Sequence, residues 1–203
     1  VLKPVSEMLT DLFDLFELEQ KAEISAIIDA GAFFKNFKNR QVAEAIWTLY
    51  GGEIEAVLYY DEDTNELEFI RGSINSDAEG VNFNRGFLKT TDPDDITRTT
   101  QVEIKKRFTF YDQRHTTGTD ILQPKHASAI LTIGPRILLR DILQATLRMR
   151  QFMTSQKVHL VSTNVTFDYY RDKVAYPEIG AFKVSDALTL GSMNEDDKQA
   201  REN

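Results

Sequence analysis

The chain has 203 residues, 41% hydrophobic and 28% charged, which is the composition of a globular protein with one domain and enough apolar side chains to form a core. Its net charge of −8, from 24 basic and 32 acidic residues, argues against a protein that coats nucleic acid, although it leaves room for a local basic strip. The absence of cysteine excludes disulfides, thiolate catalysis and cysteine-ligated metals.

A chain without cysteine suits a reducing compartment, so we expect an intracellular protein, cytoplasmic or nuclear. No apolar run approaches the roughly 18 residues of a membrane span, and no basic-then-apolar leader begins the chain. We therefore expect no membrane partner. Because the first residue is Val, we also expect the chain to be a piece of a longer protein.

The first part of the chain predicts two helices and three strands. Apolar residues recur at intervals of three and four positions in residues 4–18, which indicates a helix. Residues 25–30 form an apolar run of strand length. Asn39 offers an N-cap for a helix that Gly51-Gly52 ends at residue 50. Residues 56–60 and 66–70 predict two strands joined by a turn.

Strands and helices also alternate in the second part. The sequence predicts strands at 107–111, 127–133 and 158–162, with a helix over 137–152 between the last two. Several of these strands are apolar on both faces, which is typical of a parallel sheet covered on both sides. We therefore predict an α/β fold of RecA-like type, with a mostly parallel central sheet and helices on both faces.

The expected organisation has three parts. A leading helix occupies residues 1–22, and the main domain follows over 23–165. That domain contains an irregular, polar insert at about 72–100, where turn-forming residues are frequent. Residues 166–203 form a C-terminal extension whose acidic tail, from residue 194, we expect to be frayed.

A threonine-rich turn follows the strand at 107–111 and ends in an aspartate. Ligands of open α/β sheets bind at the carboxyl ends of the strands, where this turn lies. Gly118 allows close backbone approach, the hydroxyls of Thr116 and Thr117 suit a phosphate, and Asp120 suits a ribose hydroxyl or an arginine. The alternative is an ordinary turn, since these residue types are common in turns.

Two arginines and a glutamine lie together in the predicted helix 137–152. Gln144 and Arg148 share one helix face at i and i+4, whereas Arg150 reaches the same cleft only near a helix end. An arginine across a cleft from a triphosphate stabilises the charge that develops on the transferred phosphoryl group. The alternative is a solvated helix face.

A basic and aromatic stretch follows the first strand. The sequence FFKNFKNR interleaves phenylalanines with Lys35, Lys38 and Arg40, which is a pattern suited to binding a single nucleic-acid strand. A surface loop is the alternative reading. The three histidines are far apart and lack ligand spacing, so we expect no metal site.

The chain resembles the second, C-terminal RecA-like domain of superfamily-two helicases in the order of its motifs. A strand is followed by T-x-G-x-D, then by a second strand and a helix with Q-x-x-x-R, as in motifs five and six of those enzymes. The residues that carry this resemblance are Thr117, Gly118, Asp120, Gln144, Arg148 and Arg150. Gly118 comes one place early, Leu147 replaces a glycine and the second arginine comes one residue early.

The strings YDQRHTTGTD, QATLRMRQF and IIDAGAFFKNFKNRQVAEAI are also similar to an uncharacterised family of very large proteins with a helicase-like segment, over residues 24–164. Members of that family are often grouped with ubiquitin thioesterases. A chain without cysteine cannot supply a thiol nucleophile for such an activity.

The resemblance implies that Arg148 and Arg150 face ATP and magnesium held by an upstream RecA-like domain of the same chain. It implies that Gln144, Gly118 and Asp120 contribute to the nucleotide site, and it allows nucleic acid as a further partner. No G-x-x-x-x-G-K-[ST] loop occurs, so we expect no turnover by this chain alone. The alternative is a degenerate helicase fold that serves as an interaction or scaffold domain.

Overall fold

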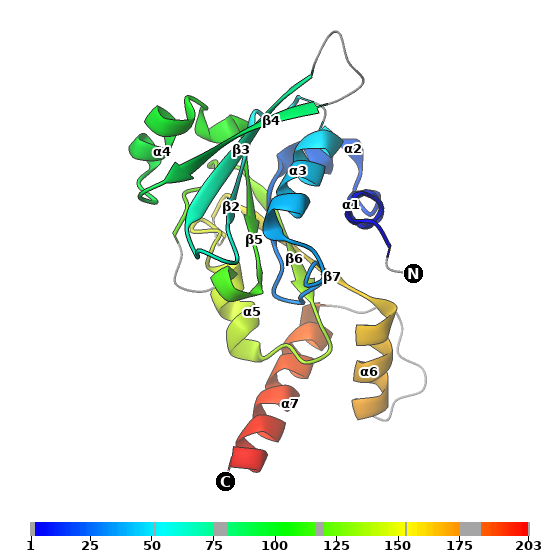
Figure 1. Cartoon of the computed structure of the whole chain (residues 1–203). Helices are drawn as coiled ribbons and strands as arrows, with labels where there is room; N and C mark the ends of the chain where they lie inside the picture. Colours follow the sequence, from blue (N-terminus) through cyan, green and yellow to red (C-terminus); the bar gives the residue numbers. More distant parts are fainter. Residues whose placement is uncertain are drawn as a thin grey trace.

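A seven-stranded sheet forms the centre of the protein in the computed structural model, which describes residues 3–50, 52–74, 81–116, 120–152, 154–174 and 184–202 (Figure 1). The strand order is β4-β3-β2-β5-β1-β6-β7. The strands are β1 Ile24–Ile28, β2 Ala56–Tyr60, β3 Leu67–Ile74, β4 Val81–Leu88, β5 Arg107–Tyr111, β6 Ser128–Ile133 and β7 Lys157–Ser162.

The five strands β2, β5, β1, β6 and β7 are parallel, while β3 and β4 add an antiparallel hairpin at one edge. Every residue of β1, β5 and β6 is buried, as expected for strands covered on both faces. The predicted α/β fold with a mostly parallel sheet is therefore confirmed, and the arrangement is consistent with a RecA-like fold.

Helices cover both faces of the sheet, with α1 and α3 on one side and α4 and α5 on the other (Figure 1). The helices are α1 Val5–Phe13, α2 Leu18–Glu23, α3 Asn39–Tyr50, α4 Pro93–Thr100, α5 Leu139–Thr146, α6 Asn164–Val174 and α7 Val184–Glu202, with short 3-10 turns η1 Ile104–Lys106 and η2 Gln113–Thr116. Among the helices that the structure describes, none combines the length and the apolar character needed to cross a bilayer.

Two apolar cores result, one on each face of the sheet. Ile27, Val57 and Phe108 pack under α1 and α3 on the first face. Ile28 and Leu131 belong to the second core, which α4, α5 and α7 cover. The alternation of side chains along each strand sends successive residues to opposite faces, which is why adjacent residues such as Ile27 and Ile28 belong to different cores.

Residues 72–100, predicted to be irregular, contain regular structure, so that prediction is wrong. All eight residues of β4 pair with β3, from Leu67 opposite Leu88 to Ile74 opposite Val81. β4 is an edge strand and therefore tolerates polar residues. Because of these polar residues, the sequence did not predict a strand here. In α4, the side chain of Asp92 accepts hydrogen bonds from the amides of Asp94 and Asp95, which caps the helix.

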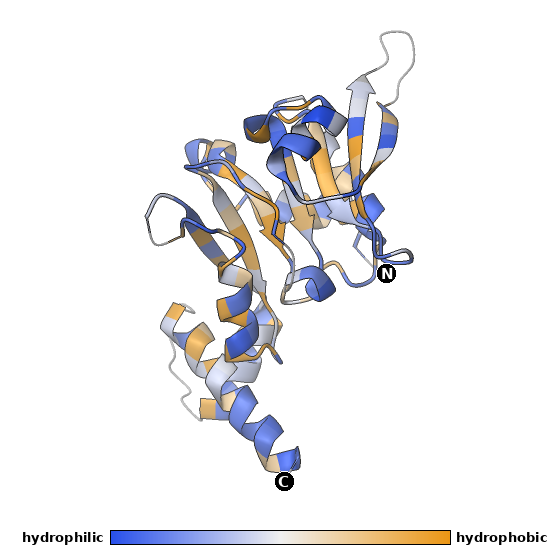
Figure 2. Cartoon of the chain, turned by 90° about the vertical axis from the view of Figure 1, so that its left-hand side faces the viewer, coloured by the Kyte–Doolittle hydropathy of each residue, from blue (hydrophilic) through white to orange (hydrophobic). Residues whose placement is uncertain are grey.

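Two other predicted boundaries also differ. The helix expected over 137–152 ends at Thr146, and turns follow, because the chain must reverse to enter β7. The tail from Asn194 is the second half of α7 rather than frayed. That half of the helix is hydrophilic toward the C-terminus (Figure 2), which is why the sequence alone suggested a solvated tail.

Both terminal segments belong to the same packed body. Leu9 and Phe13 of α1 are buried in the core over α3. In α7, Ala187 and Leu190 are buried, and Gly191 lies against the backbone of α5.

The contact at Gly191 gives a test of how α7 is held. A Cβ atom added there would lie 2.7 Å from the amide nitrogen of Leu139 and 2.8 Å from its Cα. We expect Gly191→Ala to lower the free energy of unfolding by about 1–3 kcal/mol through overpacking. Urea unfolding would measure this change, with Ser192→Ala on the exposed face of the same helix as the control.

The sign of this effect is informative. In an exposed helix, replacing glycine by alanine stabilises by about 1 kcal/mol. A Gly191→Ala protein that is more stable than the wild type would therefore contradict the close packing of α7 on α5.

Candidate functional site

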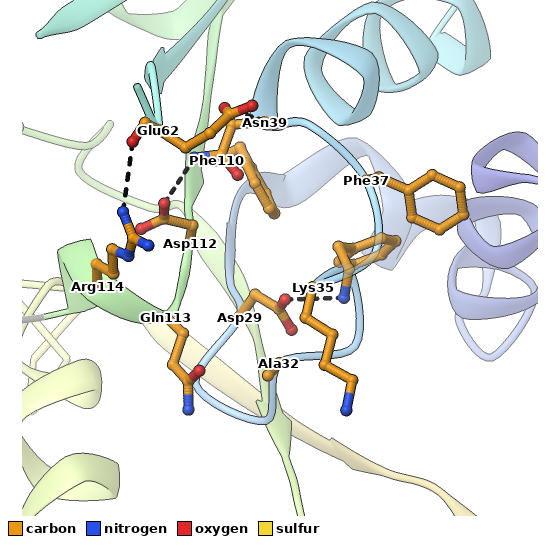
Figure 3. Close-up of a pocket in the computed structure, with 11 residues that line it drawn as sticks. Asp29, Ala32, Lys35, Phe37, Asn39, Glu62, Phe110, Asp112, Gln113 and Arg114 are labelled. Carbon is orange, nitrogen blue, oxygen red and sulfur yellow. Dashed lines mark hydrogen bonds between the residues drawn. The ribbon is translucent and has the colours of Figure 1, made fainter. Parts of the chain in front are cut away.

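A pocket of about 270 Å³ opens at the carboxyl ends of β1, β2 and β5 (Figure 3). We call it the edge pocket; it is lined by Asp29, Ala32, Phe34, Lys35, Phe37, Asn39, Glu62, Phe110, Asp112, Gln113 and Arg114. The pocket lies at the carboxyl edge of the sheet, which is the edge at which open α/β sheets bind ligands.

Asp29 follows β1 and is almost fully buried. One carboxylate oxygen accepts from the amide of Phe33 at 2.8 Å and from the hydroxyl of Thr132 at 2.7 Å, and the other accepts from the amide of Phe34 at 2.9 Å. Burial raises the pKa of Asp29 above its ordinary value, against the lowering effect of these hydrogen bonds. Asp29 therefore organises the loop after β1 rather than facing a ligand with free oxygens.

The same loop is held against β6 by two glycines. The amide of Gly31 donates to the hydroxyl of Thr132 at 2.9 Å. A Cβ atom on Gly31 would lie 2.7 Å from the nitrogen of Gly134, and one on Gly134 would lie 2.8 Å from the oxygen of Gly31. Only glycine allows these two backbones to approach so closely.

Asp112 occupies the equivalent place after β5. One carboxylate oxygen contacts Nδ1 of His115 at 2.6 Å and its amide at 2.9 Å, and the other accepts from the side-chain amide of Asn39 at 2.6 Å. Burial raises the pKa of Asp112, but the hydrogen bonds from His115 and Asn39 outweigh it, so the pKa lies below its ordinary value.

His115 is held on every side. Its ring stacks on Tyr60, with centroids 4.1 Å apart and planes 9° apart. Its Nε2 atom lies 2.9 Å from Oδ1 of Asn65, so neither ring nitrogen is open to a ligand. The Asp112–His115 pair thus resembles a catalytic dyad in composition, but its contacts give it a structural role.

The three cations predicted to bind a nucleic-acid strand differ in their surroundings. Lys35 lines the edge pocket and forms no ion pair within the described part of the chain (Figure 3). Lys38 pairs with Asp63 at 2.9 Å, and Arg40 pairs with Glu44 at 2.8 Å. Only Lys35 is therefore placed toward the pocket with its charge unneutralised.

The N-terminus of α3 is also occupied. The amide of Lys38 donates to the side chain of Gln41 at 2.9 Å, and the amide of Asn39 donates to the carboxylate of Glu62 at 3.1 Å. A phosphate at this helix end would have to displace Glu62, so the start of α3 is not a preformed binding site for a triphosphate.

The arginines of the predicted motif lie on the other face of the sheet. Arg150 forms an ion pair with Asp120, with Nε 2.8 Å from Oδ1 and Nη2 on Oδ2. Asp120 and Arg150 line an open pocket of about 570 Å³ with residues 90–93 and Leu122. The segment that begins at Asp120 and the segment after α5 are therefore brought together by this ion pair.

Arg148 lies beside this pair, near Tyr111, and is half-buried. Its Nε atom is buried and has no hydrogen-bond partner in the described structure. A buried donor without a partner is costly, so it indicates a position that a ligand or another protein could satisfy. We call Asp120, Arg148 and Arg150 the arginine cluster.

The remaining predicted residues contribute less. Gln144 is exposed on α5, and Thr116 is buried with its hydroxyl donating to the carbonyl oxygen of Gln113 at 3.0 Å. Thr117 and Gly118 lie outside the described residues. Within the described residues, no group of histidine and carboxylate side chains is placed to hold a metal ion.

Sequence reasoning did not select Asp29, Asn39, Asp112 or His115 as one network. A signal was present, since each of the apolar strands β1 and β5 is followed directly by an aspartate. Asn39 carried no such signal, because its partners Tyr60 and Asp112 lie 21 and 73 residues away in the chain. His115 is three residues from Asp112, but its second partner, Asn65, is 50 residues away.

No family model, no curated protein and no solved structure matches the chain. The helicase resemblance is therefore still a prediction.

The lowered pKa of Asp112 makes a prediction about stability. The stability that its carboxylate contributes is fully present above the ordinary carboxyl pKa of about 3.9 and is lost as pH falls through the lowered folded value. Asp112→Asn should lower the free energy of unfolding by about 1–3 kcal/mol at pH 7, and by less at pH 3. Urea unfolding at the two pH values would measure both effects.

Asp172→Asn is the matched control, since Asp172 is exposed and forms no ion pair within the described structure. Its effect should stay within about 0.5 kcal/mol. Asp29 has a raised pKa, mainly because it is buried and in part because of the negative charge of Asp112. Asp112→Asn removes the second contribution, which offsets part of the loss at pH 7. A loss in Asp112→Asn that is equal at pH 7 and pH 3 would refute the role assigned to its charge.

Proposed function

We propose that this domain is the arginine-bearing half of a helicase-like NTPase, in which an upstream RecA-like domain of the same polypeptide holds ATP and magnesium. The observation that carries the proposal is Arg148, whose buried Nε atom has no hydrogen-bond partner among the described residues and lies next to the Asp120–Arg150 ion pair. A nucleotide phosphate brought by the second domain would supply the missing acceptor. The α/β architecture supports the proposal without deciding it.

The residues present fit the phosphate end of such a nucleotide. Guanidinium groups bind phosphate oxygens through paired hydrogen bonds and stay charged at any physiological pH. Arg148 would donate to the γ-phosphate, and Asp120 would hold Arg150 in position beside it. Gln144, exposed on α5, would orient Arg148 in the turn after that helix or contact the nucleotide.

The division of labour between two domains follows from what the chain lacks. It contains no G-x-x-x-x-G-K-[ST] loop, and Gln41 and Glu62 occupy amides at the start of α3. In the proposal, this chain binds ATP weakly and does not hydrolyse it, while the phosphate cradle and the magnesium ligands come from the other domain. Nucleic acid bound at the edge pocket, through Lys35, would be the substrate of the complete enzyme.

A second candidate is an interaction domain that no longer takes part in hydrolysis. It is favoured by the ion pairs of Lys38 and Arg40, which neutralise two of the three cations predicted to hold a strand. The edge pocket also carries the carboxylates of Asp29, Glu62 and Asp112, which disfavour a polyanion.

The test is ATP hydrolysis by the complete protein that contains this chain. Removing an arginine that stabilises a transferring phosphoryl group costs about 10³-fold or more in turnover. We expect Arg148→Ala to cause such a loss, and Arg150→Ala a smaller one because Asp120 already engages its guanidinium.

Arg98→Ala is the matched control, since Arg98 is an exposed arginine of α4 that pairs with Asp95. Thermal unfolding would verify that all variants are folded. The proposal would be contradicted if the complete protein hydrolyses ATP equally well with and without Arg148→Ala. A complete protein without ATPase activity would favour the interaction domain.

A further inference from the structure

A second polar pocket, of about 440 Å³, lies between the loop after β6 and helices α6 and α7. We call it the α6–α7 pocket; its lining includes Arg136, Leu138, Tyr169, Lys198 and Arg201. Its volume lies in the range of about 300–1,000 Å³ typical of sites for small molecules. None of these residues belongs to the edge pocket or to the arginine cluster.

Three cations and two carboxylates, Asp197 and Glu202, belong to the lining of this pocket. Arg136 and Arg201 form no ion pair within the part of the chain that the structure describes. Lys198 is 3.7 Å from Glu202 on the same exposed helix turn, a distance at which surface pairs contribute little.

The carboxylates of the pocket form no ion pair with these arginines within the described structure. Asp197 pairs with Lys173 of α6, and the charge of Arg201 also contributes to lowering the pKa of Asp197. Glu202 lies beside Lys198. With Lys173 included, four cations stand against two carboxylates, so the pocket is net positive.

The walls of the pocket are tied to one another. The side-chain amide of Asn194 on α7 donates to the carbonyl oxygens of Pro135, at 3.1 Å, and Ile137, at 2.8 Å, which fixes the residues on either side of Arg136. The hydroxyl of Thr166 on α6 donates to the carbonyl oxygen of Ile133 at 3.1 Å. The Lys173–Asp197 pair then joins α6 to α7. The arginines therefore project from a backbone held in place before any ligand arrives.

The position in the fold adds an independent argument. The loop that carries Arg136 leaves the carboxyl end of β6, next to the central strand β1, where connections diverge to opposite faces. Ligands of open α/β sheets collect at that edge. Leu138 and Tyr169 supply an apolar side for the organic part of a ligand.

We propose that the α6–α7 pocket binds a phosphate group, free or carried by a small molecule, through the guanidinium groups of Arg136 and Arg201. Guanidinium groups match the oxygens of phosphate with paired donors, and a net positive pocket favours a dianion over a single carboxylate. Lys198 adds a third positive charge, and its ammonium group can donate hydrogen bonds in several directions. This site is separate from the proposed NTPase site and does not depend on it.

Isothermal titration calorimetry of the chain at low ionic strength tests the proposal, because salt screens such contacts over about 10 Å at 0.1 M. The probes are inorganic phosphate, glycerol 3-phosphate and acetate. We expect saturable binding of both phosphate probes and weaker binding of acetate. Tighter binding of glycerol 3-phosphate than of phosphate identifies a phosphorylated small molecule as the ligand, whereas equal binding identifies free phosphate.

Arg136→Ala and Arg201→Ala should each weaken binding about tenfold or more. The matched control is Lys125→Ala, an exposed and unpaired cation in the turn before β6, at the opposite edge of the sheet. The double variant Arg148→Ala, Arg150→Ala should bind phosphate like the wild type, which separates this site from the arginine cluster. Circular dichroism and thermal unfolding would establish that every variant is folded.

The proposal is overturned if the wild type shows no saturable binding of either phosphate probe. It is equally overturned if the Arg136 and Arg201 variants bind as tightly as Lys125→Ala, or if the double variant of the arginine cluster is the one that loses binding.

Discussion

The carboxyl edge of the sheet depends on the burial of Asp29. A charged carboxylate is costly to remove from water, and this one is stabilised only because Thr132 and the amides of Phe33 and Phe34 converge on it. Those three contacts join the end of β1 to β6 and determine the path of the loop toward α3. The close backbone contact of Gly31 with Gly134 follows from the same constraint. The edge pocket is therefore shaped by a polar network rather than by apolar packing.

A second network, centred on Asp112, ties the remaining elements of that edge together. It links β5 to α3 through Asn39 and to the β2–β3 turn through His115 and Asn65. Satisfied buried networks of this kind confer rigidity, because each member loses more than one bond when it moves. The carboxylates at the edge pocket thus serve mainly to hold loops, and the groups that remain available for a ligand are Lys35, Gln113 and Arg114.

The distribution of unpaired cations separates the three candidate sites more clearly than their volumes do. Lys35 and Arg114 lie among carboxylates at the edge pocket, Arg148 lies next to an arginine that Asp120 already neutralises, and Arg136 and Arg201 share one pocket. The first arrangement disfavours a polyanion, the second suits a phosphate delivered by another domain, and the third suits a phosphate from solution. One acidic chain can hold both arginine sites because most of its other cations are paired on the surface.

The sequence by itself determined the α/β class, the parallel strands and the helices α1, α3 and α5, because apolar periodicity and strand length reflect local burial. It suggested an arginine as one possible partner of Asp120, and the structure identifies that arginine as Arg150. It did not show β4, α4 or the end of α5 at Thr146, since an edge strand can be polar and a helix end depends on where the chain must turn. Only the tertiary structure decided which charges are neutralised. Ion pairs such as Lys38–Asp63 and hydrogen bonds such as Asn39–Asp112 join residues far apart in the chain, and no local pattern records them.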